Sequence, residues 1–212
     1  MTKKERVIAA IEFKGPDRIP VLAFTGDIKE GDVLNYPLFP VNENDGNKSE
    51  WGYIWENLGD GTMGQPKKPI ISDWSMLRDY KFPDVNSESR FERVAEFKKQ
   101  SEGYFLNAEM GISGFNTYLF LRGFINAMID FQGRDKRALE LLNNIFEVER
   151  MVIKQAAGFG FDGVLFEDDW GTQKGLMISP DLWLEIFKPV YKKHFDFIHG
   201  LNLKYFFTVA EI

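Results

Sequence analysis

The stretch Phe161–Gln173, FDGVLFEDDWGTQ, places three consecutive acidic residues at the end of an apolar run. Its first eight residues have the length and composition of a buried strand. The periodic apolar positions of residues 136–160 predict a long helix before that strand. Ser179 and Pro180 predict the N-cap and first turn of a second helix after it, which extends to residue 200. This strand between two helices predicts an α/β fold with parallel strands.

The flanking sequence extends the same alternation of strands and helices. Thr2 and Glu5 have the spacing of a capping box at the start of an N-terminal helix. Further helices are predicted over 87–103, where Ser89 and Glu92 repeat that spacing, and over 115–131. Further strands are predicted over 18–24, 104–111 and 203–209, whereas residues 26–75, rich in Gly, Asn, Asp and Pro, predict an excursion from the sheet.

Composition limits the classes of function. The 212 residues carry a net charge of −6 without a basic run that would bind nucleic acid. The sequence lacks an apolar stretch of the roughly 20 residues that span a bilayer, so we expect a cytoplasmic protein with no nucleic-acid or membrane partner. The chain contains no cysteine, which excludes disulfides, thiolate nucleophiles and cysteine-bound metals within it. We therefore predict no metal site and no cofactor in this chain.

The acidic residues at the end of the 161–168 strand are the main candidates for chemistry. Ligands of parallel α/β folds bind at the carboxyl ends of the strands, and neighbouring carboxylates raise each other's pKa. We predict Asp168 and Asp169 as catalytic residues and Glu167 as a substrate contact. Because side chains alternate along a strand, one or two of the three should face the site, and the alternative role for the others is a turn cap or a surface charge.

Four further residues are candidate substrate contacts: Trp170 and Gln173 on the following loop, Glu109 at the end of the preceding strand, and Arg122 in the apolar 115–131 segment. Each has a structural alternative. Trp170 can pack over the end of the sheet, Glu109 can pair with a loop arginine, and Arg122 can pair with one of the carboxylates.

The remaining indoles and the two histidines are assigned structural roles. Trp51, Trp55 and Trp74 are predicted to be core residues of the excursion. His194 and His199 are predicted to lie at the surface or at a helix end, with neither acting as a ligand.

Several segments resemble the uroporphyrinogen decarboxylase superfamily: ERVIAAIEFKGPDRIPV (5–21), EWGYIWENLGDGTMGQ (50–65), SDWSMLRDYKFPD (72–84), LRGFINAMID (121–130) and DDWGTQKGLMISPDLWLEIFKPVYKKHFDFIH (168–199). They are most similar to the decarboxylase-like branch that includes corrinoid-dependent methyltransferases. The resemblance implies a (β/α)8 barrel whose site lies at the carboxyl ends of the strands. Since about four strands are predicted, we expect roughly the N-terminal half of such a barrel, as a single domain over 1–212 that is incomplete at its C-terminus.

Two departures from the family limit what the resemblance implies. Complete members of the methyltransferase branch continue the strand that matches KYFF (204–207) into the His and Cys that hold zinc, and this chain continues into TVAEI instead. Zinc and corrinoid are thus expected only in complete relatives. Porphyrinogen decarboxylases carry an Arg-rich segment where this chain has FTGDIKEGD (24–32), which lacks the arginines that would bind a substrate with many carboxylates.

Three hypotheses follow. The first is a corrinoid-linked methyltransferase-type enzyme that binds a small-molecule substrate and interacts with a corrinoid protein. The second is a cofactor-free decarboxylase of a porphyrinogen or a smaller acid, with Asp168 stabilising the developing charge. The third is a non-catalytic remnant or one half of a split protein, because a half-barrel leaves unpaired strand edges that favour a homo-oligomer or a complementing chain.

Overall fold

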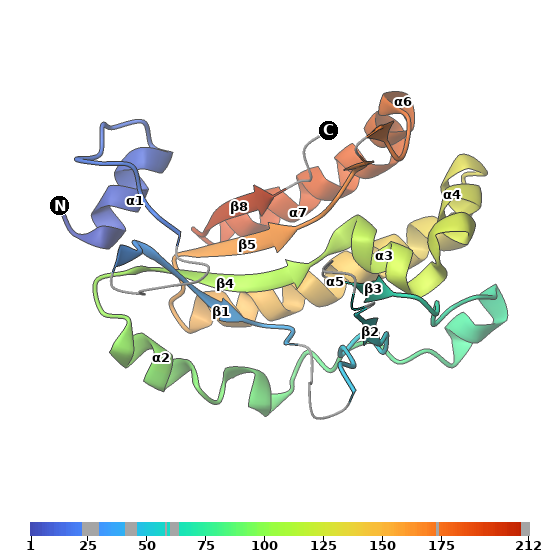
Figure 1. Ribbon diagram of the computed structural model, residues 1–212, viewed down its shortest axis with the longest axis horizontal. Helices are drawn as coiled ribbons and strands as arrows, with labels where there is room; N and C mark the ends of the chain where they lie inside the picture. Colours follow the sequence, from blue (N-terminus) through green and yellow to red (C-terminus); the bar gives the residue numbers. More distant parts are fainter. Residues whose placement is uncertain (23–29, 41–45, 58, 60–63, 173, 209–212) are drawn as a thin grey trace.

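A four-stranded parallel sheet forms the centre of the chain (Figure 1). The computed structural model describes residues 1–212 except 23–29, 41–45, 58, 60–63, 173 and 209–212. The order of the strands is β1-β4-β5-β8, with bounds β1 Val33–Pro37, β4 Phe105–Ile112, β5 Gly163–Glu167 and β8 Lys204–Thr208. Two antiparallel ladders pair β2 Trp55–Glu56 with β3 Gln65–Pro66, and β6 Gly171–Thr172 with β7 Gly175–Leu176.

Helices connect the strands and cover the sheet. They are α1 Lys3–Ile11, α2 Val94–Gln100, α3 Gly114–Arg122, α4 Phe124–Gln132, α5 Lys136–Gly158, α6 Pro180–Leu182 and α7 Lys188–Gly200. Short 3₁₀ helices span Trp74–Arg78 and Glu88–Phe91, and a π-helical turn spans Trp183–Phe187. All neighbouring strands of the central sheet are parallel. The predicted α/β fold is therefore confirmed, with the architecture of a partial (β/α)8 barrel.

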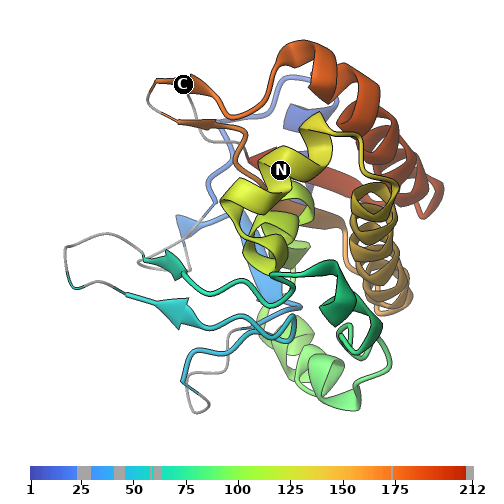
Figure 2. The same ribbon diagram turned by 90° about the vertical axis from the view of Figure 1, so that its right-hand side faces the viewer.

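The two faces of the sheet differ in what covers them. On β4, Leu106, Ala108 and Met110 pack in one apolar cluster with α5 residues such as Val152 and Ile153. The alternate residues of the strand point to the opposite face, which corresponds to the interior of a barrel. Figure 2 shows α5 and α7 together on one side of the molecule and the β2–β3 hairpin on the other.

Helix α1 packs at the amino-terminal end of the sheet. Val7 forms a small apolar cluster with Val33 of β1 and Phe105 of β4. Arg6 donates to the buried Asp32 (Nη1–Oδ1 2.6 Å), and Arg18 donates to both oxygens of the same carboxylate. Thr2 and Glu5 form the predicted capping box. Apolar and ion-paired side chains therefore occupy the amino-terminal end of the sheet. We expect a ligand site at the carboxyl end instead.

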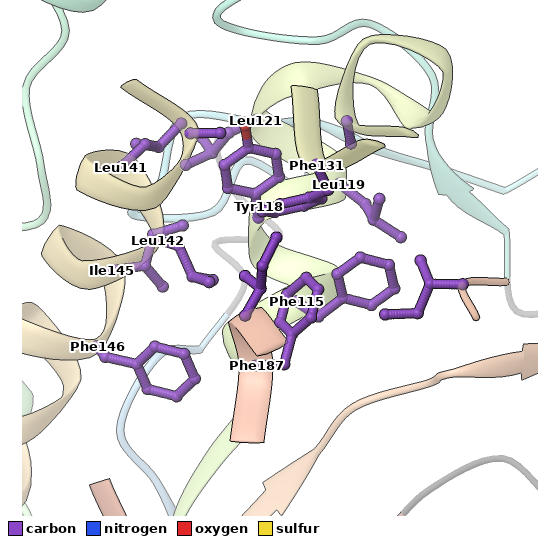
Figure 3. Close-up of a cluster of buried hydrophobic side chains, with 14 of the residues drawn as sticks. Phe115, Tyr118, Leu119, Leu121, Phe131, Leu141, Leu142, Ile145, Phe146 and Phe187 are labelled. Carbon is purple, nitrogen blue, oxygen red and sulfur yellow. The ribbon is translucent and has the colours of Figure 1, made fainter. Parts of the chain in front are cut away.

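A second apolar cluster lies beyond the carboxyl ends of the strands, between α3, α4, α5 and the π-helical turn. Figure 3 shows Phe115 and Tyr118 of α3 pointing toward this cluster, with Phe187 below Phe115. The rings of Phe115 and Phe187 meet edge to face with centroids 5.3 Å apart. This packing fixes α3 directly over the ends of β4 and β5.

The position of the first strand differs from the prediction. Residues 18–22 form only an isolated bridge between Leu22 and Val33, Ile19 is 84% exposed, and residues 23 and 24 lie outside the described part of the chain. The strand of the sheet is β1, which lies within the predicted excursion, so the excursion does not begin at residue 26. Instead, the backbone N–H of Val21 donates to the carboxylate of Asp32, which also pairs with Arg6 and Arg18.

Two predicted helices are interrupted. Residues 87–103 form a 3₁₀ turn followed by the short α2, and the N-cap of α2 is Arg93 without a side-chain cap, so the capping box of Ser89 and Glu92 is absent. Residues 115–131 divide into α3 and α4 at Gly123, whose φ of 78° is readily adopted only by glycine. Ser179 does cap the next helix, as predicted. The π-helical turn ends two residues before Pro189, which has no backbone N–H to donate within the helix.

Candidate functional site

An open groove of about 400 Å³ lies at the carboxyl ends of β4 and β5. Its walls are aromatic and its polar groups are two amides and one carboxylate. The aromatic residues are Phe39, Trp51, Tyr53 and Trp55, the amides are Asn47 and Asn57, and the ends of the strands contribute Met110, Gly111, Ile112 and Glu167. This location is where parallel α/β folds bind ligands.

Glu167 and Glu109 lie near each other on the same face of the sheet. Glu109 pairs in register with Leu165, two residues before Glu167 on the adjacent strand. Burial and, second, the charge of Glu167 raise the pKa of Glu109. Neither carboxylate makes a hydrogen bond or a salt bridge to any residue that the structure describes. The two acids are therefore neighbours on the inward face of the sheet, where Glu167 lines the groove and Glu109 is not among the lining residues. The loop arginine considered for Glu109 is not its partner among the described residues.

A β-bulge between Glu109 and Gly111 sets which side chains of β4 enter the groove. Before the bulge, Glu109 shares a face with Leu165. After it, Ile112 pairs in register with Glu167. Gly111 has φ of 64°, a conformation suited to glycine at a bulge. The bulge thus presents Ile112 beside the Glu167 carboxylate.

Asp168 is directed away from the groove, into the protein. Its side chain accepts hydrogen bonds from the backbone N–H groups of Phe115 (3.0 Å) and Asn116 (2.9 Å) and from the Tyr191 hydroxyl. The residue is 1% exposed, and burial raises its pKa well above the ordinary value of an aspartate. These contacts join the end of β5 to the first turn of α3, which is the capping role considered as the alternative for this residue.

Glu149 of α5 is a second buried carboxyl group, and it contacts the first residues of α3. It is not among the site residues predicted from the sequence. Glu149 accepts from the Gly114 N–H (3.0 Å) and from Ser113 Oγ (3.4 Å). Burial raises the pKa of Glu149 to about 7. The sequence signal was available, because Glu149 lies four residues after Ile145 and four before Ile153, on the buried stripe of the helix.

The prediction that His194 lies at the surface is wrong. His194 is 1% exposed between the rings of Phe146 and Phe166, and its Nε2 is 3.7 Å from a Glu149 oxygen. Burial lowers the pKa of His194 to about 3. His194 continues the buried positions of α7 from Tyr191, three residues earlier, so helical periodicity outweighs its polarity. His199 is exposed, as predicted.

Arg122 lies outside the groove. Its guanidinium donates to both oxygens of Asp130 (2.8 and 3.2 Å) and to the carbonyl of Ile71, and it lies over the ring of Trp74. The predicted alternative of ion pairing is thus observed, with Asp130 instead of one of the strand-end acids.

The other residues of the 169–173 loop have separate positions. Trp170 is 8% exposed and stacks on Phe115 with centroids 4.3 Å apart, which is the packing alternative considered for it. Asp169 is exposed, and its backbone N–H and carbonyl meet the side-chain amide of Asn116 in the amide orientation that satisfies both groups. Gln173 lies outside the described residues. Of the three indoles assigned to the core, Trp51 is buried, and Trp55 and Trp74 are half-buried against the apolar cluster.

The zinc implied by the methyltransferase branch does not fit the residues present. The chain has no cysteine, and the described part of it contains no group of three or more His, Asp or Glu side chains that could hold a metal ion. None of the helices among the described residues is long and apolar enough to cross a bilayer.

No protein-family model and no curated protein matches the sequence. Among solved structures, the fold is similar to that of a methyltransferase from Methanosarcina mazei, with a TM-score of 0.66 and 14% sequence identity, over 100% of this chain and 70% of the other. The similarity in fold thus spans the whole chain.

Proposed function

We propose that this chain carries the substrate groove of a methyl-transfer enzyme of the uroporphyrinogen decarboxylase superfamily, in the branch that works with corrinoids. The observation that carries the proposal is the groove at the carboxyl ends of β4 and β5. The fold around this groove is similar to that of a methyltransferase structure over 100% of this chain and 70% of the other. The family segments quoted above supply the link to the corrinoid branch.

In this proposal, residues at the groove bind and orient the substrate. Glu167 and Glu109 contact its polar part, and Trp55 contacts its apolar part. Asp168 acts as a positioning residue because its carboxyl holds the first turn of α3 instead of facing the groove. The methyl donor is a methylated corrinoid supplied as substrate by a partner protein. A methylated corrinoid brought to the groove would supply the methyl group as an electrophile, and Glu167, Glu109 and Trp55 would hold the acceptor whose lone pair takes it.

Decarboxylation with Asp168 at the reacting carbon is the weaker alternative. The Asp168 carboxyl is enclosed by α3 and Tyr191, so a substrate has no path to it without opening that contact. The groove also offers no arginine or lysine among its described lining residues, as binding of a polycarboxylate requires.

The two edge strands of the central sheet, β1 and β8, indicate what a partner would have to supply. Among the described residues, β8 pairs on one side only and the outer side of β1 has only the isolated bridge between Val33 and Leu22, whereas a barrel requires both edges to be paired. We propose that further strands, from a second copy or from a complementing chain, complete the barrel in the active protein.

Methyl transfer tests the proposal directly. The purified chain is incubated anaerobically with methylcobalamin and a panel of thiol and amine acceptors, alone and with cell extract as a source of a complementing chain. Demethylation of the corrinoid is followed by its visible spectrum, and the methylated product by mass spectrometry. We expect transfer that Glu167→Gln reduces and that Glu96→Gln, on the exposed side of α2, leaves unchanged. Absence of transfer in every combination contradicts the proposal.

A further inference from the structure

His194 of α7 is buried with both ring nitrogens unsatisfied. Neither Nδ1 nor Nε2 has a hydrogen-bond partner among the residues that the structure describes, and the imidazole lies between the rings of Phe146 and Phe166. A buried polar group without a partner is costly. Nε2 lies 3.7 Å from Oε2 of Glu149, which is about 0.5–1 Å beyond hydrogen-bonding distance. The unsatisfied imidazole and this carboxyl group are therefore placed to form a hydrogen bond after a small movement.

The protonation state of Glu149 decides which of the two groups can donate. A protonated carboxyl group can donate its hydrogen from Oε2 to a bare Nε2, while the neutral imidazole keeps its own hydrogen on Nδ1. An ionised carboxylate only accepts, so Nε2 must then carry the hydrogen in order to pair with it. When the Glu149 proton leaves to solvent, the imidazole hydrogen therefore moves from Nδ1 to Nε2, and the imidazole is neutral in both states.

Glu149 is surrounded by titratable and charged groups from each element packed against it. These are the Ser113 hydroxyl at the start of α3, Asp168 at the end of β5, Tyr191 and His194 of α7, Tyr53 of the groove wall, and Arg150 of its own helix α5. Burial, the largest effect, raises the pKa of Glu149, whereas the Gly114 N–H, the Ser113 hydroxyl and Arg150 favour the ionised form. Burial lowers the pKa of His194, so the imidazole of the pair is uncharged.

Helix α3 connects this pair to the wall of the groove. Glu149 contacts the first residue of α3 through the Gly114 N–H. Phe120, two residues before the end of the helix, packs edge to face against Tyr53 and Trp55, with ring centroids 5.2 and 5.8 Å apart. Tyr53 and Trp55 both line the groove. Because packed helices shift as units, a displacement of the first turn of α3 also moves the rings that Phe120 contacts.

We propose that Glu149 and His194 form a buried pair that positions α3, and with it the Tyr53 and Trp55 walls of the groove, according to whether Glu149 carries a proton. In the protonated state, Glu149 donates to His194 Nε2 and draws α5 toward α7. In the ionised state, the hydrogen bonds to the carboxylate from the Gly114 N–H and the Ser113 hydroxyl become charge-assisted and draw the first turn of α3 toward α5. Glu149 is thus a positioning residue. Its role concerns the shape of the groove, goes beyond the proposed methyl transfer and holds for any substrate.

Nitrogen NMR of the histidines tests the pair directly, because the chain contains only two. Long-range ¹H–¹⁵N spectra of the full chain labelled with ¹⁵N-histidine report which ring nitrogen carries the hydrogen, and the exposed His199 is the reference in the same spectrum. We expect His194 to change from the Nδ1–H to the Nε2–H tautomer with a midpoint near pH 7, and Glu149→Gln to abolish the change. A single His194 tautomer between about pH 5.5 and 8.5 overturns the proposal.

A second measurement determines whether the groove wall follows the pair. ¹⁹F NMR of the chain labelled with 5-fluorotryptophan gives a resonance for each of the five indoles, and Trp55→Phe identifies that of Trp55. We expect the Trp55 resonance to shift with the same midpoint as His194 and to stay constant in Glu149→Gln. A Trp55 resonance that does not titrate, or that titrates equally in Glu149→Gln, contradicts the positioning role.

Two further variants keep the test decisive if Glu149→Gln does not fold. Ser113→Ala removes a hydroxyl that favours the ionised carboxylate and should raise both midpoints by about 0.5 pH unit. Glu140→Gln is the matched control, because it removes an exposed carboxylate from the same helix and should leave both midpoints unchanged. Midpoints that Ser113→Ala does not move, or that Glu140→Gln moves as far, refute the assignment to Glu149.

The two titrations separate this inference from the proposed function. If both occur and methyl transfer is absent, the positioning role of Glu149 stands and the enzymatic proposal is contradicted. If methyl transfer occurs and neither His194 nor Trp55 titrates with Glu149, the reverse holds.

Discussion

The pair Asp168 and Asp169 offers a sharp test of the site, because adjacent acids predicted to do the same chemistry have opposite surroundings. Asp168→Ala removes the acceptor of two buried backbone N–H groups and of the Tyr191 hydroxyl. Each buried donor left without a partner costs about 1–3 kcal/mol. The three together predict a loss of about 3–9 kcal/mol in the free energy of unfolding, a large part of the roughly 5–15 kcal/mol typical of a domain.

Asp169→Ala is the matched control. Asp169 is exposed, and its backbone keeps the contact with Asn116 after the substitution. Interactions of an exposed carboxylate contribute about 0–1 kcal/mol, so the loss in the free energy of unfolding should be well below that of Asp168→Ala. Tyr191→Phe provides an intermediate, since it removes one donor and leaves Asp168 in place, and should cost about 1 kcal/mol.

Urea unfolding followed by far-ultraviolet circular dichroism measures the three variants under one protocol. Transition midpoints should fall in the order Asp169→Ala, Tyr191→Phe, Asp168→Ala, with similar denaturant dependence for all three. If Asp168→Ala and Asp169→Ala unfold at the same urea concentration, the capping role of Asp168 at the start of α3 is refuted.

Three further predictions concern stability. Burial raises the pKa of Glu149 to about 7, so the folded state binds a proton there more tightly than the unfolded state, and stability should fall as the pH rises from about 4.5 to 7. Glu149→Gln should remove a decline on the order of 3 kcal/mol, seen as a flatter curve of unfolding free energy against pH. Asp130→Ala leaves the buried Arg122 guanidinium uncompensated and should cost about 3–5 kcal/mol, while Glu185→Ala, at an exposed ion pair, should change the stability far less by the same urea titration. Gly114→Ala places a Cβ within 3 Å of three buried side chains at a φ of 49° and should lower the stability by about 3 kcal/mol, measured as a drop in Tm.

Strong local patterns predicted the elements around β5 correctly. The apolar run of β5, the long amphipathic stripe of α5 and the Ser179 cap all appear where the sequence indicates. Their signals are local and agree with the tertiary contacts. The segment 18–24 also has a strand-like composition, yet Ile19 is exposed, because the ion pairs of Asp32 hold this part of the chain at the end of the sheet.

Local patterns placed the acids at the end of β5 but did not show which of them faces the groove. The sequence located the acids at the end of β5, and the groove lies there. Which acid faces the groove depends on the local path of the chain after β5: Glu167 continues the inward face of the strand, whereas Asp168 turns toward α3. Glu149 was not predicted because it is distant in sequence from the acids at the end of β5. Only the packing of α5 against α3 brings its carboxyl group beside the Gly114 N–H.

The extra residue in β4 decides which side chain stands beside the Glu167 carboxylate. With the bulge, Ile112 pairs with Glu167, whereas in a regular strand of the same length Gly111 would hold that position and Ile112 would turn toward the helices. The acid would then face an open space in place of a bulky neighbour. A change in the local path of one strand, with the connectivity of the sheet untouched, is thus enough to reshape the space beside the acid.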